Sequence, residues 1–178
     1  MNKLKFLIFF LILIAACAPT ETLRLGSYAV HGIDVSKHQG QIDWQKVAAQ
    51  DIHFAYIKAT EGRTHRDTLY AQNWEGAKKV KILRGAYHFY RPSVSAKEQA
   101  QNFINRVELS YGDLPPVLDI EIDDNLPRET IIEGMREWIR LVEIRYAARP
   151  IIYTNYKFYN KFVAGEFDKY PIWIAQYG

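Results

Sequence analysis

The stretch Pro116-Val117-Leu118-Asp119-Ile120-Glu121-Ile122, with residues 128–147 after it, decides the predicted fold. Its short apolar run is typical of a buried strand. In residues 128–147 the apolar positions recur at three- and four-residue steps: Ile131, Ile132, Met135, Trp138, Ile139, Val142 and Tyr146. That spacing predicts a helix with one buried face. A strand followed by such a helix is one β/α unit of a parallel sheet.

The same alternation runs through the rest of the chain. Further strands are predicted at 31–36, 53–60, 83–90, 150–155 and 171–177, and further helices at 44–50, 69–80, 96–109 and 158–163. Parallel strands with right-handed helical crossovers predict an α/β fold of the irregular (β/α) TIM-barrel type. The active site of such a barrel lies at the carboxyl ends of the strands. The polar residues at these ends are Asp34, Lys58 with Glu61, His88, Asp119 with Glu121, and Asn155.

The strand count predicts an incomplete barrel. Six strands are recognisable, whereas a closed barrel has eight and typically about 250 residues. The last strand, 171–177, is apolar and would leave an exposed edge, which natural proteins avoid. We therefore expect the sequence to be part of a longer protein that continues after Gly178.

The N-terminus predicts export rather than a folded element. Lys3 and Lys5 precede the apolar run 6–16, which is shorter than the roughly 20 residues of a transmembrane helix. Residues 14–17, Ile-Ala-Ala-Cys, resemble a bacterial lipobox, in which the cysteine becomes lipidated. The interpretation is a signal peptide over 1–16, a tether over 17–30 and one domain over 31–178. An ordinary signal peptide cut elsewhere is the alternative.

Localisation and partners follow from the same features. Lipidation of Cys17 would anchor the protein to a membrane, and Ala18 after it favours the outer membrane or cell surface. Removing residues 1–16 removes two lysines and no acid, so most of the formal charge of +3 disappears. Nothing therefore indicates a nucleic-acid partner. The single cysteine excludes an internal disulfide. We expect a monomer.

Asp119 and Glu121 are the candidate catalytic pair. Side chains two apart on a strand point to the same face, so these two carboxyl groups lie together. Their repulsion makes the less solvated group hold its proton to higher pH. Glycoside hydrolysis uses that asymmetry, with one protonated acid and one carboxylate. A solvated pair at a strand end is the alternative, because the D-x-E pattern is common.

Several motifs occur in a fixed order around this pair. They are Gly32-Ile-Asp-Val-Ser-Lys-His-Gln-Gly40, Phe54-Ala-Tyr-Ile-Lys-Ala-Thr-Glu-Gly62, Gly85-Ala-Tyr-His-Phe-Tyr90, Ile152-Tyr-Thr-Asn155 and Trp173-Ile-Ala-Gln-Tyr177. Together with the Asp-Ile-Glu strand they resemble family 25 of the glycoside hydrolases, the bacterial and phage muramidases. The resemblance covers residues 31–178.

The resemblance implies a flattened barrel that cleaves the β-1,4 bond after N-acetylmuramic acid in peptidoglycan glycan strands, without a cofactor. Glu121 matches the family's general acid, Asp119 its neighbouring carboxylate, and Asp34 an acid on the first strand. The implied reaction retains configuration: the substrate's acetamido oxygen is the nucleophile, and Asp119 stabilises the oxazolinium ion. The family also has an aspartate near its last barrel strand, which this sequence does not match. That absence puts the activity of these 178 residues in doubt.

The remaining candidates are substrate-binding residues. Tyr87, Tyr153, Trp173 and Tyr177 could line a sugar groove or pack in the core. Lys58 and Glu61 could orient the acids or pair with each other. Because they are three apart, direct pairing requires the strand to bend before Gly62. His88 lies between aromatic residues, which favours a structural role over a site role.

Other chemistry has little support in the sequence. The five histidines show no H-E-x-x-H or similar spacing, so no metal is expected. A chitinase would carry D-x-x-D-x-D-x-E, but Leu114 and Val117 occupy the first two aspartate positions. The other alternative is a lipid-anchored peptidoglycan-binding protein that has lost catalysis.

Overall fold

The computed structural model describes residues 29–176. The predicted signal peptide, Cys17 and Tyr177 lie outside them. The parallel strands are β1 (Gly32–Val35), β2 (Phe54–Glu61), β4 (Leu83–Phe89), β5 (Val117–Asp119), β6 (Ile151–Asn155) and β7 (Ile172–Ala175). The helices are η2 (Lys37–Gln39), α1 (Trp44–Ala48), α2 (Tyr70–Lys79), α3 (Ala96–Ile104), α4 (Arg128–Tyr146), α5 (Tyr156–Phe158) and the π-helix η3 (Tyr159–Val163).

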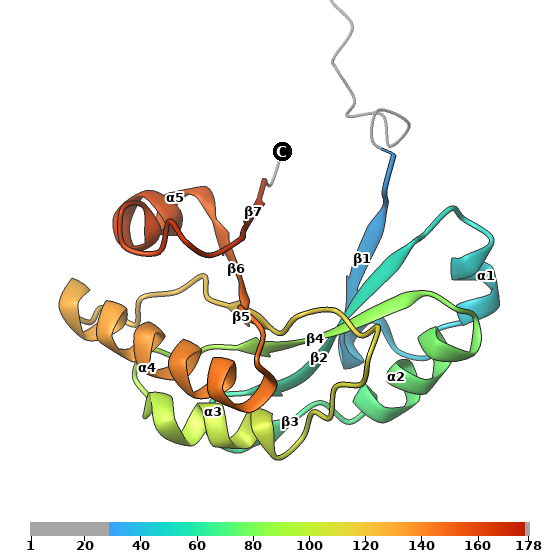
Figure 1. Cartoon of the computed structure of the whole chain (residues 1–178), viewed down its shortest axis with the longest axis horizontal. Coiled ribbons are helices and arrows are strands. Elements are labelled where there is room, and N and C mark those ends of the chain that lie inside the picture. The colour runs from blue at the N-terminus through green and yellow to red at the C-terminus, as the bar shows by residue number, and fades with distance from the viewer. Residues whose placement is uncertain (1–28, 177–178) are drawn as a thin grey trace, which may run out of the picture.

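The strands form one sheet in the order β1-β2-β4-β5-β6-β7, and all of these neighbours are parallel (Figure 1). The six predicted strands are therefore confirmed. The two-residue strand β3 (His65–Arg66), which pairs antiparallel with the end of β2, was not predicted. The helix expected over 96–109 ends at Ile104, because the amides of Arg106 and Val107 both donate to the Phe103 carbonyl in a turn.

The sheet curves into an open half-barrel. Tyr56 on β2 and Trp173 on β7 belong to strands that are not neighbours, yet their ring centroids are 5.6 Å apart. Gly85 on β4 makes room for this contact, since a Cβ there would lie 2.2 Å from the Tyr56 ring. The concave face is thus lined by side chains from strands at both ends of the sheet. The predicted barrel type, with six strands, is confirmed.

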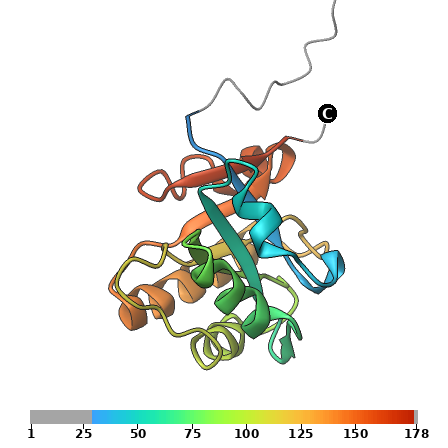
Figure 2. The same ribbon diagram turned by 90° about the vertical axis from the view of Figure 1, so that its right-hand side faces the viewer.

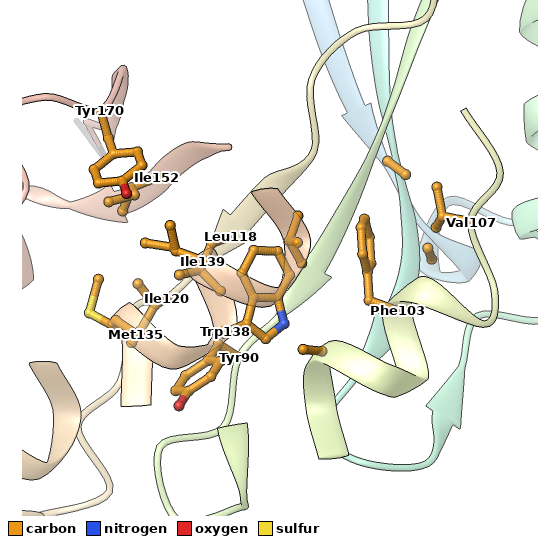
Figure 3. Close-up of a cluster of buried hydrophobic side chains, with 14 of the residues drawn as sticks. Tyr90, Phe103, Val107, Leu118, Ile120, Met135, Trp138, Ile139, Ile152 and Tyr170 are labelled. Atoms are coloured by element: carbon orange, nitrogen blue, oxygen red, sulfur yellow. The ribbon is translucent and has the colours of Figure 1, made fainter. Parts of the chain in front are cut away.

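Helices α2, α3 and α4 cover the convex face of the sheet (Figures 1 and 2). The core lies between them and the strands. Figure 3 shows Trp138 and Met135 of α4 packed with Phe103 of α3 and Leu118 of β5. The predicted buried face of α4 is confirmed, with Tyr146 at its edge, where its hydroxyl donates to the Val107 carbonyl at 2.8 Å. Within residues 29–176, every helix is too short or too polar to span a lipid bilayer.

Strand β2 is irregular where the site begins. Its pairing with β4 shifts between Lys58 and Thr60, so Ala59 bulges out of register. The shift breaks the strict alternation of faces, as bulges do. Lys58 and Glu61 consequently reach each other, with Lys58 Nζ 2.7 Å from Glu61 Oε2. The bend that direct pairing required is present.

Candidate active site

A pocket of about 310 Å³ opens on the concave face at the carboxyl ends of the strands. Each of the six parallel strands contributes at least one side chain, or a side chain just after its end. The lining residues are Asp34, Ser36, His38, Tyr56, Lys58, Tyr87, Phe89, Val117, Asp119, Glu121, Tyr153 and Trp173. The three predicted acids, Asp34, Asp119 and Glu121, all line this pocket. They therefore lie at the end of the sheet where the sequence predicts the site.

Asp119 and Glu121 line the same pocket, with different solvation. Asp119 ends β5 and is 7% exposed, whereas Glu121 follows the strand and is partly exposed. Burial raises the pKa of Asp119 well above its ordinary value, and the negative charges of Glu121 and Asp34 raise it further. Among the described residues, no donor reaches the buried oxygen Asp119 Oδ1. In the free site Asp119 is therefore the carboxyl group that holds its proton.

Asp34 on β1 completes the acidic group. Although the residue is exposed at the open edge of the sheet, the pocket walls partly desolvate its carboxyl group and raise its pKa. Three carboxyl groups around one pocket cannot all be charged without a large electrostatic cost. The arrangement favours a shared proton and a cation nearby.

Lys58 supplies that cation. It is 8% exposed, lines the pocket, and its charge lowers the pKa of Asp119. Glu61 does not line the pocket but lies behind Lys58, where it also accepts from Arg91 Nε at 2.9 Å. Burial alone would raise the pKa of Glu61, but the hydrogen bonds and charges of Lys58 and Arg91 lower it to about 2. Both cations also lie over the Phe89 ring, so the ammonium group of Lys58 is held in place.

Aromatic side chains form the rest of the wall. Three of the aromatic residues singled out in the sequence line the pocket: Tyr87, Tyr153 and Trp173. The rings of Tyr153 and Trp173 pack edge to face, with their centroids 5.0 Å apart. Burial, and then the charges of Asp119 and Asp34, raise the pKa of Tyr87, so its hydroxyl stays protonated as a donor. Tyr56 and Phe89 also line the pocket and were not singled out from the sequence.

His88 lies outside the pocket. It is on β4 between Tyr87 and Phe89, so alternation turns it to the convex face, where it is fully buried. Thr60 Oγ1 and Gln99 Oε1 bond its two ring nitrogens at 2.7 and 3.1 Å, and the ring stacks on Trp138. Burial lowers its pKa to about 4. The structure therefore places His88 in the core, in agreement with the structural role that the sequence favoured, and corrects the substrate-binding alternative.

One group of side chains with metal-ligating atoms occurs within residues 29–176: His31, Asp51 and His53. These residues precede β1 and β2, at the opposite end of the strands from the pocket. Asp51 lies 3.3 Å from His31 Nδ1, and His53 Nδ1 accepts the His31 amide at 3.2 Å. Sequence spacing did not reveal this group, because Asp51 reaches His31 across 20 residues. It cannot act on a substrate in the pocket.

The sequence indicates Asn155 only as a polar strand end, but in the structure its side chain holds the loop that follows β5. Its Nδ2 donates to the Glu121 carbonyl at 3.1 Å, and its Oδ1 accepts from the Phe158 amide at 2.9 Å. The residues from Ile120 onward are no longer in β5, so this bond and the one from the Ile120 amide to the Tyr153 carbonyl tie them to β6.

Residues 33–178 match the family model described as glycosyl hydrolases family 25. The chain belongs to glycosyl hydrolase family 25. Lysozyme M1 of Streptomyces globisporus is 39% identical over 165 residues, which cover 84% of this chain and 55% of that protein. The uncharacterized protein YegX of Escherichia coli K12 is 43% identical over 156 residues, covering 85% of this chain and 57% of that protein. The chain thus spans a little over half the length of these curated relatives.

Solved structures of family 25 share the fold. The family 25 glycosyl hydrolase from Bacillus anthracis superimposes with a TM-score of 0.80 at 35% identity, covering 83% of this chain and 70% of that chain. A bacterial lysozyme from Streptomyces coelicolor gives a TM-score of 0.78 at 33% identity, covering 85% and 76%. The half-barrel of this chain is therefore a fold that it shares with solved family 25 glycoside hydrolases.

Proposed function

We propose that the protein is an N-acetylmuramidase that cleaves the β-1,4 bond between N-acetylmuramic acid and N-acetylglucosamine in peptidoglycan. The observation that carries this proposal is the shared pocket of Asp34, Asp119 and Glu121, in which one carboxyl group is buried and its neighbour is more solvated. Lysozyme names among the family 25 relatives support the choice of substrate.

The proton must change place when the sugar binds. In the free site Asp119 holds it, yet Glu121 is the group placed to protonate the leaving oxygen. A bound sugar displaces water from the pocket, and its acetamido N–H donates to the unpartnered Asp119 Oδ1 and stabilises that carboxylate. The proton then resides on Glu121 and the negative charge on Asp119.

The reaction follows from these two states. Glu121 gives its proton to the glycosidic oxygen as the bond from that oxygen to the anomeric carbon breaks. The acetamido oxygen attacks that carbon, and the carboxylate of Asp119 stabilises the positive oxazolinium ion. Glu121 then takes a proton from water as the water attacks, which restores the acid and releases a sugar of retained configuration. Between the two steps, the ammonium group of Lys58 offsets the negative charge of the carboxylates that line the pocket.

Glu121→Gln tests the proposal, because the amide is isosteric but cannot donate a proton as an acid. We expect it to abolish lysis of purified cell walls while the protein still sediments with them. The matched control is Glu133→Gln on the exposed face of α4, which should lyse walls normally. Equal lysis by the Glu121 variant would remove this residue from the mechanism. Sedimentation without lysis by the unaltered protein would instead favour the peptidoglycan-binding alternative.

We also propose that Cys17 is lipidated and anchors the enzyme to the outer membrane or cell surface, where it would meet peptidoglycan. The lipobox-like residues 14–17 support this. Mass spectrometry of the mature N-terminus should find a diacylglyceryl-modified Cys17 as the first residue. An unmodified cysteine, or a first residue elsewhere, would contradict the anchor.

A further inference from the structure

Three side chains with metal-ligating atoms meet at the amino ends of β1 and β2. His31 immediately precedes β1, and Asp51 and His53 lie between α1 and β2. Each offers one ligand atom, and these atoms all lie within 4.8 Å of one another. The proposed reaction does not use this group, because the pocket opens at the other end of the strands.

The sheet holds the two histidines beside each other. The His31 carbonyl accepts from the His53 amide at 2.8 Å, and the His53 carbonyl accepts from the Leu83 amide at 3.0 Å. Both backbones are therefore fixed by strand pairing, and only the side chains must adjust to a ligand. Such preorganisation lowers the entropic cost of binding.

Asp51 enters the group through the turn before β2. Its φ of 59° is in the left-handed region, which aspartate and asparagine adopt more readily than most residues. Its carboxylate faces both rings, with Oδ2 3.3 Å from His31 Nδ1 and Oδ1 3.7 Å from His53 Nε2. One carboxylate thus lies within reach of two imidazoles.

These distances suit the ligands of a Zn²⁺ ion. Tetrahedral zinc has bonds of about 2.0 to 2.1 Å to nitrogen and oxygen, which places neighbouring ligand atoms roughly 3.3 Å apart. His31 and Asp51 already have that separation, and the exposed side chains of Asp51 and His53 can close on an ion. Two imidazoles and a carboxylate are ligands that zinc prefers, and they leave a fourth position for water.

Ligation requires one existing hydrogen bond to break. His53 Nδ1 accepts from the His31 amide at 3.2 Å, so the proton of the neutral ring is then on Nε2. A metal needs a ring nitrogen without a proton, so binding through Nε2 moves the proton to Nδ1 and breaks the bond to the amide. That bond is exposed and at the long end of the usual range, which makes it a weak competitor.

We propose that His31, Asp51 and His53 bind a divalent transition-metal ion, with Zn²⁺ the best match, as a structural clip between the amino ends of β1 and β2. In the described part of the chain β1 ends the sheet and pairs only with β2, so the clip would restrain an edge strand. The expectation of no metal rested on local histidine spacing, whereas strand pairing brings these ligands together across 22 residues.

Calorimetric titration of the purified protein with zinc chloride, after chelation and removal of the chelator, tests the site. We expect one ion per chain. Losing even an outer-shell partner of a metal ligand costs about 10- to 100-fold in affinity, so Asp51→Asn and His53→Ala should each weaken binding by at least about 100-fold. Asparagine also suits the left-handed backbone at position 51, so this variant tests the carboxylate and keeps the turn.

Thermal unfolding gives a second measurement, because an ion that binds only the folded chain stabilises it by mass action. Zinc at about 100 times its Kd should raise the Tm of the unaltered protein by about 5 to 10 °C and leave that of both variants in place. The matched control is His65→Ala, which removes a partly buried histidine of β3 outside the group and should keep the full zinc affinity and Tm shift.

Two results would overturn the proposal: zinc does not bind, or it binds equally well to Asp51→Asn and His53→Ala, which would place the ion elsewhere. If both variants fail to fold, the Co²⁺-loaded unaltered protein decides, since a four-coordinate site absorbs visible light strongly and a six-coordinate one does so weakly. Lysis of cell walls well below the Tm should be the same with zinc or with chelator, and a loss with chelator would contradict a structural clip. Zinc binding and lysis are thus tested separately, and either can fail alone.

Discussion

Asn155 allows a structural effect to be separated from a catalytic one within a single side chain. Its two polar atoms do different things: Nδ2 donates to the carbonyl of Glu121, and Oδ1 caps the turn that begins α5 by accepting from Phe158. Alanine removes both bonds. Aspartate keeps an oxygen for the Phe158 amide but loses the donor to Glu121.

The magnitudes follow from these bonds. A neutral hydrogen bond contributes about 1 kcal/mol to stability, and an N-cap about 1 kcal/mol. Asn155→Ala should therefore lower the free energy of unfolding by about 2 kcal/mol, and Asn155→Asp by about 1 kcal/mol. Both should lower kcat on cell walls by at least about tenfold with little change in KM, since Glu121 loses its tie to β6 and moves away from its reacting position.

Urea unfolding and steady-state lysis measure the two effects. If both variants unfold as expected but keep the original kcat, Asn155 has only a structural role and the reasoning about Glu121 is wrong.

Two further predictions concern charge. Lys58→Met removes the cation that lowers the pKa of Asp119, so the acidic limb of the activity profile should move to higher pH; an unchanged limb would exclude this electrostatic role. His88 has a pKa lowered to about 4, below its ordinary value, so the unfolded chain binds the proton first as pH falls. The contribution of neutral His88 to the free energy of unfolding is complete above the pKa of the unfolded chain's histidine, near 6.5, and is lost as the pH falls toward 4. About 2 kcal/mol of it is lost between pH 7 and pH 5. Urea unfolding at pH 7 and at pH 5 checks this, and the free energy of unfolding of the His88→Gln variant should differ less between the two.

Much of the fold could be predicted because it depends on local patterns. The apolar run before Asp119 and the spacing of Ile131, Met135 and Trp138 specify a strand and a buried helix face wherever they occur. Alternation along a strand predicts that Asp119 and Glu121 share a face, and both line the pocket although β5 itself ends at Asp119. These features need no knowledge of distant residues.

The remaining features depend on contacts between distant segments. Arg91 reaches Glu61 across 30 residues, and the bulge at Ala59 that brings Lys58 to Glu61 has no local sequence signal. The Tyr56–Trp173 contact depends on the curvature of the whole sheet. His88 was ambiguous because an aromatic residue precedes it and another follows it, and its burial depends on contacts with distant residues such as Trp138.

The most direct measurement of the central claim is the identity of the new reducing end. Purified peptidoglycan is digested with the protein, the products are reduced with borohydride, and the reduced amino sugars are identified by mass spectrometry. A bond cut after N-acetylmuramic acid yields muramitol derivatives, which this account predicts. Glucosaminitol derivatives, or no new reducing ends at all, would contradict it.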